Sequence, residues 1–97
     1  MKVTMDILMQ KRSAILDCAK RYGAGKIRVF GSVARGDTGE LSDVDFLVSF
    51  APERSLLEHG ALIMDLRDLL QCEVDVISEN GMRPRFRDRI LKDAIPL

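Results

Sequence analysis

Residues that build metal centres and covalent cross-links are scarce in this sequence. Its two cysteines, Cys18 and Cys72, lie far apart and match no zinc-binding spacing. No secretory signal precedes them, so we expect reduced thiols that pack as small apolar residues in a cytoplasmic protein. The single histidine, His59, has no companion ligands, and we expect it to be a partly exposed helix residue.

Long apolar runs and an excess of one charge are also absent. No stretch approaches the roughly 20 apolar residues that a membrane-spanning helix needs, so no membrane partner is expected. Fifteen basic and fifteen acidic residues cancel, so no overall field draws the chain to nucleic acid. The 97 residues, 46% of them hydrophobic, are predicted to form one domain over residues 1–97.

The hydrophobic periodicity predicts helices that alternate with strands. Helices are expected at residues 4–22, 55–71 and 84–94, strands at 26–30, 43–50 and 73–77, and a short helical turn at 33–35. Four apolar residues of the second long helix are expected to face inward: Leu56, Ile63, Leu66 and Leu70. Ser55 and Glu58 suit a capping box at its start. The order α-β-α-β-α-β-α implies a two-layer α/β (α+β) fold, with a small mixed twisted sheet flanked by helices.

Three aspartates occur on strands that otherwise supply core residues. Asp43 and Asp45 are two positions apart, so on a strand their carboxylates share one face. Asp75 lies on the next strand, opposite that strand's apolar residues, and all three converge if the strands are neighbours. Such carboxylates repel one another unless a divalent cation such as Mg²⁺ binds them. Two interpretations stay open: a metal site, or the solvent face of an amphipathic strand, where aspartate is nevertheless depleted.

A second candidate feature precedes these aspartates. A strand that runs into Gly31-Ser32 and then a short helix presents free backbone N–H groups and a hydroxyl, which bind phosphate oxygens. Glycine allows close approach of a ligand, and Arg35 could add a fixed positive charge. A Gly-Ser pair alone is usually an ordinary turn. Together with the aspartates, it fits a site for a triphosphate and a metal.

Four arginines form a basic run near the C-terminus: Arg83, Arg85, Arg87 and Arg89. A nucleic-acid patch, with Phe86 among them, is one interpretation. The simpler one is that spacing by two residues scatters the charges around a helix, while Asp88 and Asp93 dilute them. Contacts of some of these arginines with the acidic site or with a partner remain open.

These motifs resemble those of a known family. Gly31-Ser32, followed after ten residues by Asp43-Val44-Asp45, is similar to the signature of the polymerase-β-type nucleotidyltransferase superfamily. The fuller strings at 30–37 and 42–48 resemble the minimal nucleotidyltransferases, its stand-alone single-domain branch. Residues 73–77 resemble that family's third-carboxylate strand and 83–94 its C-terminal helix. The resemblance covers nearly the whole chain, and no motif position departs from it.

The resemblance implies a reaction and roles for individual residues. Family members transfer a nucleoside monophosphate from a triphosphate to a hydroxyl and release pyrophosphate. By position, Gly31 and Ser32 would bind the nucleotide's terminal phosphates. Asp43, Asp45 and Asp75 would be the catalytic residues and would ligate two Mg²⁺ ions, with Asp75 also helping to remove the acceptor's proton.

The family also implies a partner. Minimal nucleotidyltransferases are commonly encoded beside a HEPN-domain ribonuclease, a toxin that they neutralise by transferring AMP from ATP to a tyrosine near its active site. The chain leaves no room for an acceptor-binding domain after the site strands, which fits an acceptor on another polypeptide or another copy. Two alternatives stay open: a non-catalytic antitoxin that neutralises its partner by complex formation, and transfer to a small molecule or RNA with a second subunit.

Overall fold

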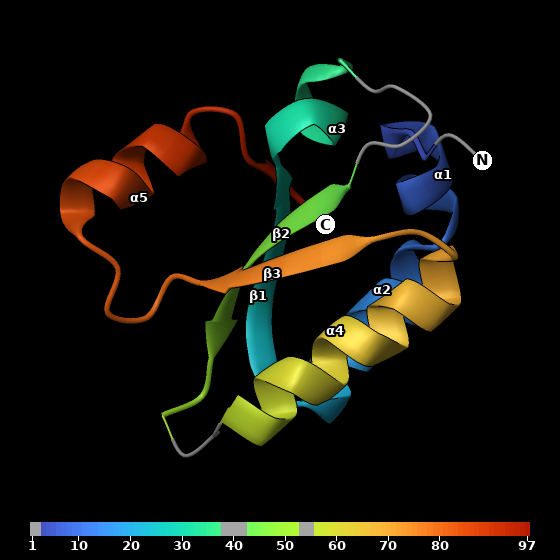
Figure 1. The fold of residues 1–97 in the computed structure, drawn as a ribbon, viewed down its shortest axis with the longest axis horizontal. Helices are drawn as coiled ribbons and strands as arrows, with labels where there is room; N and C mark the ends of the chain where they lie inside the picture. Colours follow the sequence, from blue (N-terminus) through green and yellow to red (C-terminus); the bar gives the residue numbers. More distant parts are fainter. Residues whose placement is uncertain (1–2, 38–42, 53–55) are drawn as a thin grey trace.

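The structure, a computed structural model, describes residues 3–37, 43–52 and 56–97. The elements follow one another as shown in Figure 1: α1 (Met5–Gln10), α2 (Arg12–Arg21), β1 (Ala24–Phe30), α3 (Gly31–Arg35), β2 (Val44–Phe50), α4 (Leu56–Leu70), β3 (Val74–Ser78), α5 (Pro84–Leu91) and β4 (Ile95–Pro96). The predicted mixed fold of helices on a small sheet is confirmed. None of the helices in the described ranges is long and apolar enough to cross a membrane.

The four strands form one sheet in the order β3-β2-β1-β4. β1 pairs antiparallel with both β2 and β4, whereas β2 pairs in parallel with β3. The parallel pair needs a long crossover connection, which α4 supplies. β2 therefore lies inside the sheet, with Asp45 opposite Phe30 on one side and opposite Asp75 on the other.

The hydrophobic core lies between one face of the sheet and the helices α1, α2 and α4 (Figure 1). Val44, Phe46 and Val48 of β2 point into it and have no exposed surface. The helices contribute fully buried side chains at helical spacing: Leu8, Ile15, Leu62, Leu66 and Leu70. Since side chains alternate along a strand, Asp45 lies on the opposite face of β2.

The predicted helix over residues 4–22 is two helices. The backbone leaves the helical conformation at Lys11, which has φ −100° and ψ 13°. The Lys11 ammonium donates to the backbone carbonyl of Leu69 at 3.2 Å, a contact with α4 that no local pattern indicates. The break allows α1 and α2 to pack in different directions.

Two other expectations for the helices need correction. Leu56 was expected to face inward but is 85% exposed, because the first turn of α4 extends beyond the strands (Figure 1). The last helix ends at Leu91 instead of residue 94, because Ile95 and Pro96 form a short strand, β4, beside β1. The predicted capping box depends on Ser55, which lies outside the described residues.

The fully buried Leu66 of α4 tests this core at a distance from the carboxylates. We expect Leu66→Ala to lower the free energy of unfolding by about 2–5 kcal/mol, because it removes apolar contacts and leaves a cavity. Met64→Ala is the matched control in the same helix, where the side chain is 56% exposed, and should change that energy by no more than about 0.5 kcal/mol. Urea unfolding measures both, and equal losses would contradict the core described above.

Candidate functional site

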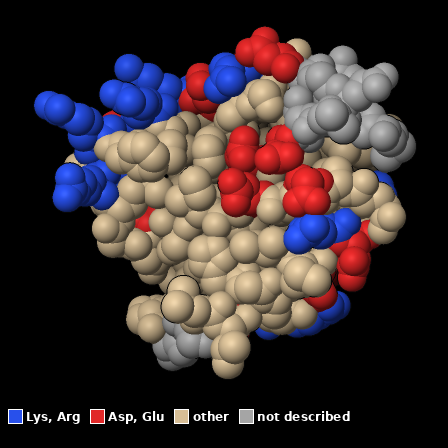
Figure 2. All heavy atoms as spheres, viewed as in Figure 1, with Lys and Arg blue, Asp and Glu red and all other residues tan. Residues whose placement is uncertain are grey.

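Three carboxylates lie where β2 and β3 begin. Asp45 of β2 is directly opposite Asp75 of β3 in the parallel register, and Asp43 immediately precedes β2. Paired residues of neighbouring strands point to the same face, so Asp45 and Asp75 lie side by side. Figure 2 shows acidic side chains gathered in this region, below α3 and over the first residues of the two strands. The strands predicted to carry these aspartates are therefore neighbours.

Burial and the charges of this cluster both act on Asp45. Burial raises the pKa of the Asp45 carboxyl above its usual range, and the neighbouring carboxylates of Asp75 and Asp43 raise it further. The positive charge of Arg35 acts in the opposite direction. Asp45 is half-buried, whereas Asp43 and Asp75 are exposed. Ionised Asp45 therefore lowers the stability of the folded state, and a bound cation would relieve this loss.

Gly31 provides the space that the Asp45 carboxylate occupies. Gly31 begins α3 with a φ of +76°, in the left-handed region that favours glycine. A Cβ atom at this position would overlap the Asp45 Oδ2 atom and would lie 3.3 Å from its Cγ. Ser32 follows in the first turn of α3 and is half-buried. Two features therefore favour glycine at position 31: the left-handed backbone conformation and the space taken by the Asp45 carboxylate.

Arg35, at the end of α3, lies near the carboxylates but is already engaged. Its Nε donates to Asp37 Oδ2 at 3.2 Å, and its Nη1 donates to Asp93 Oδ2 at 3.4 Å. The side chain is 47% exposed. Because a guanidinium has five N–H donors, Arg35 can also contact a phosphate, as predicted from the sequence, without giving up either carboxylate.

The donor atoms of the cluster fit a hard divalent cation. Carboxylate oxygens are the ligands that Mg²⁺ prefers. Within residues 3–37, 43–52 and 56–97, however, no three acidic, histidine or cysteine side chains stand in an arrangement that could hold a metal ion. Asp43 and Asp75 are exposed and keep the rotamer freedom needed to turn toward Asp45.

An ion-pair network on the same face of the sheet was not predicted. Glu79 follows β3 and accepts hydrogen bonds from Arg28 Nη1 and Arg87 Nε, each at 3.2 Å. Its side chain is only 11% exposed. Arg28 is opposite Leu47, which shares the face of Asp45, so the network links α5 to that face. The sequence alone could not indicate this network, because 51 residues separate Arg28 from Glu79 and only the strand pairing brings them together.

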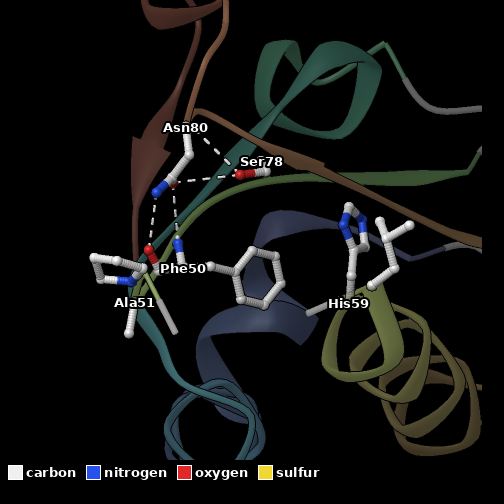
Figure 3. Close-up of a pocket in the computed structure, with 7 residues that line it drawn as sticks. Phe50, Ala51, His59, Ser78 and Asn80 are labelled. Atoms are coloured by element: carbon white, nitrogen blue, oxygen red, sulfur yellow. Dashed lines mark hydrogen bonds between the residues drawn. The ribbon is translucent and has the colours of Figure 1, made fainter. Parts of the chain in front are cut away.

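A hollow of about 410 Å³ lies at the other end of β2 and β3, away from the carboxylates (Figure 3). The Asn80 side chain donates to the backbone carbonyl of Phe50 at 2.9 Å and accepts from the Phe50 N–H at 3.2 Å. His59 Nε2 lies 2.6 Å from the carbonyl oxygen of Val76, so this nitrogen carries the proton. The His59 ring also packs on Phe50, with centroids 5.2 Å apart. These groups hold α4 and the strand ends together and do not join the carboxylate cluster.

Comparison with known proteins identifies relatives along most of the chain. Residues 11–97 match the family model described as a nucleotidyltransferase domain. The chain is 38% identical over 81 residues to a Methanocaldococcus jannaschii protein assigned as a protein adenylyltransferase, covering 84% of this chain and 87% of the relative. It is 36% identical over 76 residues to protein adenylyltransferase MntA of Thermococcus cleftensis, covering 78% and 77%.

Solved structures share the fold. A protein assigned as a minimal nucleotidyltransferase superposes with a TM-score of 0.87 at 46% identity, covering 98% of this chain and 97% of the other. A toxin–antitoxin structure with AMP-PNP gives a TM-score of 0.75 at 19% identity, covering 87% and 69%. An MNT antitoxin in complex with tri-AMPylated Shewanella oneidensis HEPN toxin gives 0.69 at 16%, covering 91% and 69%. The chain described here therefore belongs to the nucleotidyltransferase domain family and, within it, to the minimal nucleotidyltransferases.

Proposed function

We propose that this protein transfers adenylate from ATP to a hydroxyl group of another protein. The observation that carries the proposal is the pairing of Asp45 with Asp75 beside Gly31, at the edge where Asp43 also lies. It places three acidic groups next to the first turn of a helix that follows a strand. Two curated relatives of this chain are named as protein adenylyltransferases, which supports this class of acceptor.

Each site residue has a distinct task in this proposal. Gly31 and Ser32 bind the terminal phosphates of ATP through backbone N–H groups and the Ser32 hydroxyl. The acceptor oxygen attacks the α-phosphorus, the bond from that phosphorus to the β-phosphate oxygen breaks, and pyrophosphate leaves. Asp75, which is exposed at the strand edge, takes the proton of the acceptor hydroxyl. Arg35 completes the phosphate contacts through N–H groups that are not bonded to Asp37 or Asp93.

Asp43, Asp45 and Asp75 would hold two Mg²⁺ ions. When bound, these ions supply charge neutralisation for the phosphate oxygens and for the attacking and leaving oxygens. The chemistry of the donor set and the crowded charge on Asp45 support this assignment. Asp45 is the half-buried member of the set and lies beside Gly31, and the two exposed aspartates adjust around it.

The acceptor in this proposal is a tyrosine of a HEPN-domain toxin, and the protein acts as the antitoxin. An MNT antitoxin that shares this fold was solved with a tri-AMPylated HEPN toxin, which supports a HEPN partner for this chain. Neutralisation by complex formation alone would not require the Asp43, Asp45 and Asp75 cluster. We therefore favour the enzyme over a purely binding antitoxin.

The direct test is transfer of label from α-labelled ATP, with Mg²⁺, to the product of the neighbouring gene, which the proposal expects to be a HEPN protein. We expect Asp43→Ala with Asp45→Ala to reduce transfer at least about 100-fold, because charge stabilisation at the α-phosphate is lost. Asp17→Ala with Asp68→Ala is the matched control, since it removes two exposed aspartates outside the cluster.

Absence of label on the HEPN protein with the wild-type chain would contradict the proposal. Undiminished transfer by the Asp43→Ala, Asp45→Ala variant would contradict the assignment of the site. Toxin neutralisation that survives in that variant without transfer would favour the binding antitoxin.

The space at Gly31 gives a second test. We expect Gly31→Ala to lower the transfer rate at least about tenfold, because the new Cβ displaces the Asp45 carboxylate from its position. Gly81→Ala is the matched control: Gly81 has the same φ of +76° but no atom within 4 Å of the added Cβ. Both variants should lose about 1–2 kcal/mol of unfolding free energy from backbone strain. Equal transfer rates in the two variants would show that the Asp45 position does not depend on Gly31.

A further inference from the structure

The helix α5 stands apart from the two layers of the fold (Figure 1). None of its eight residues is buried. Within the described part of the chain, two polar contacts tie it to the rest of the fold: Arg87 donates to Glu79 at 3.2 Å, and Asp93, just beyond the helix, accepts from Arg35 at 3.4 Å. The second contact links the end of α5 to the helix α3 of the proposed nucleotide site.

One face of α5 carries positive charges that have no partner in the described part of the chain. Arg85, Arg89 and Lys92 follow the spacing of one helix face, and all three are exposed. They line a hollow of about 590 Å³ together with Asp88. Among the described residues, none forms an ion pair or hydrogen bond with these three side chains, in contrast to Arg87. Figure 2 shows the basic side chains gathered over α5.

We propose that this face of α5, formed by Arg85, Arg89 and Lys92, is a docking surface for an acidic patch on the protein that receives the nucleotide. The identity of the partner as an acceptor rests on the proposed function. Three like charges within two helical turns repel one another, and carboxylates of a partner relieve that repulsion. Phe86 of the same helix is 51% exposed and adds an aromatic anchor, as arginine and aromatic residues do in protein interfaces.

The charge pattern around α5 favours a protein over a nucleic acid. Asp88 lies among the three cations and would repel a continuous phosphate backbone. The face of the molecule that carries the basic side chains of α5 also carries the acidic cluster (Figure 2). A polyanion that continued from one to the other would meet Asp45 and Asp75, whereas a folded protein can present opposite charges to the two regions. A protein docked on α5 would also lie on the same face as the transfer site.

Binding of labelled octaglutamate, measured by fluorescence anisotropy at low salt, tests the docking surface without nucleotide or transfer. We expect Arg85→Glu with Arg89→Glu to weaken binding at least tenfold. Lys20→Glu with Lys26→Glu is the control, since it makes the same change of charge at exposed positions on α2 and β1 and should weaken binding less than twofold. Melting temperatures within a few degrees of wild type would show that both variants are folded.

An octauridine RNA of similar charge, measured in parallel, should bind the wild-type chain more weakly than the peptide. Failure of octaglutamate to bind, an equal loss in the two variants, or tighter binding of the RNA would overturn the docking surface. Adenylate transfer by a wild-type chain that does not bind the peptide would leave the proposed function standing and remove only this inference. Peptide binding by a wild-type chain that transfers no adenylate would support the docking surface and contradict the proposed function.

Discussion

The parallel pairing of β2 with β3 is the constraint on which the site depends. It sets Asp45 opposite Asp75, and the antiparallel pairing on the other side sets Asp45 beside Phe30, so that Gly31 follows at the same level. A one-residue shift in the β2–β3 register would turn one of the two carboxylates toward the core. The buried face of β2 prevents that shift, since Phe46 is fully enclosed. The core therefore fixes the position of the carboxylates.

The site is assembled against a stability cost. Asp45 is half-buried beside two other carboxylates, and its pKa is raised by burial and by their charge. Gly31, which has no Cβ atom, leaves room for the same carboxylate and adopts its left-handed backbone conformation without strain. The crowded charge at Asp45 lowers the stability of the metal-free protein, and a bound divalent cation would compensate that cost. Such local costs are typical of residues placed for chemistry instead of for packing.

Much of this arrangement could be predicted from the sequence. The alternation of apolar residues in β2 and β3 has the period of a strand, and it indicated that Asp45 and Asp75 avoid the core. Contacts between distant segments could not be predicted in the same way. Lys11, where the first predicted helix divides, bonds to the backbone of α4, and the ion pair between Arg28 and Glu79 depends on the sheet order. Hydrophobic periodicity predicts each helix or strand from its own residues. It does not predict which distant segments pack against that element.

The melting temperature of Asp45→Asn, with and without Mg²⁺, tests the central claim most directly. The folded-state pKa of Asp45 lies above its unfolded value, so ionised Asp45 destabilises the fold above that pKa, and the cost disappears as pH falls through it. We therefore expect the metal-free variant to melt higher than wild type at pH 7.5, with a difference that shrinks toward pH 4. Mg²⁺ should raise the melting temperature of wild type more than that of the variant. A variant that is less stable than wild type at pH 7.5 without metal, or equally stabilised by Mg²⁺, would contradict the account.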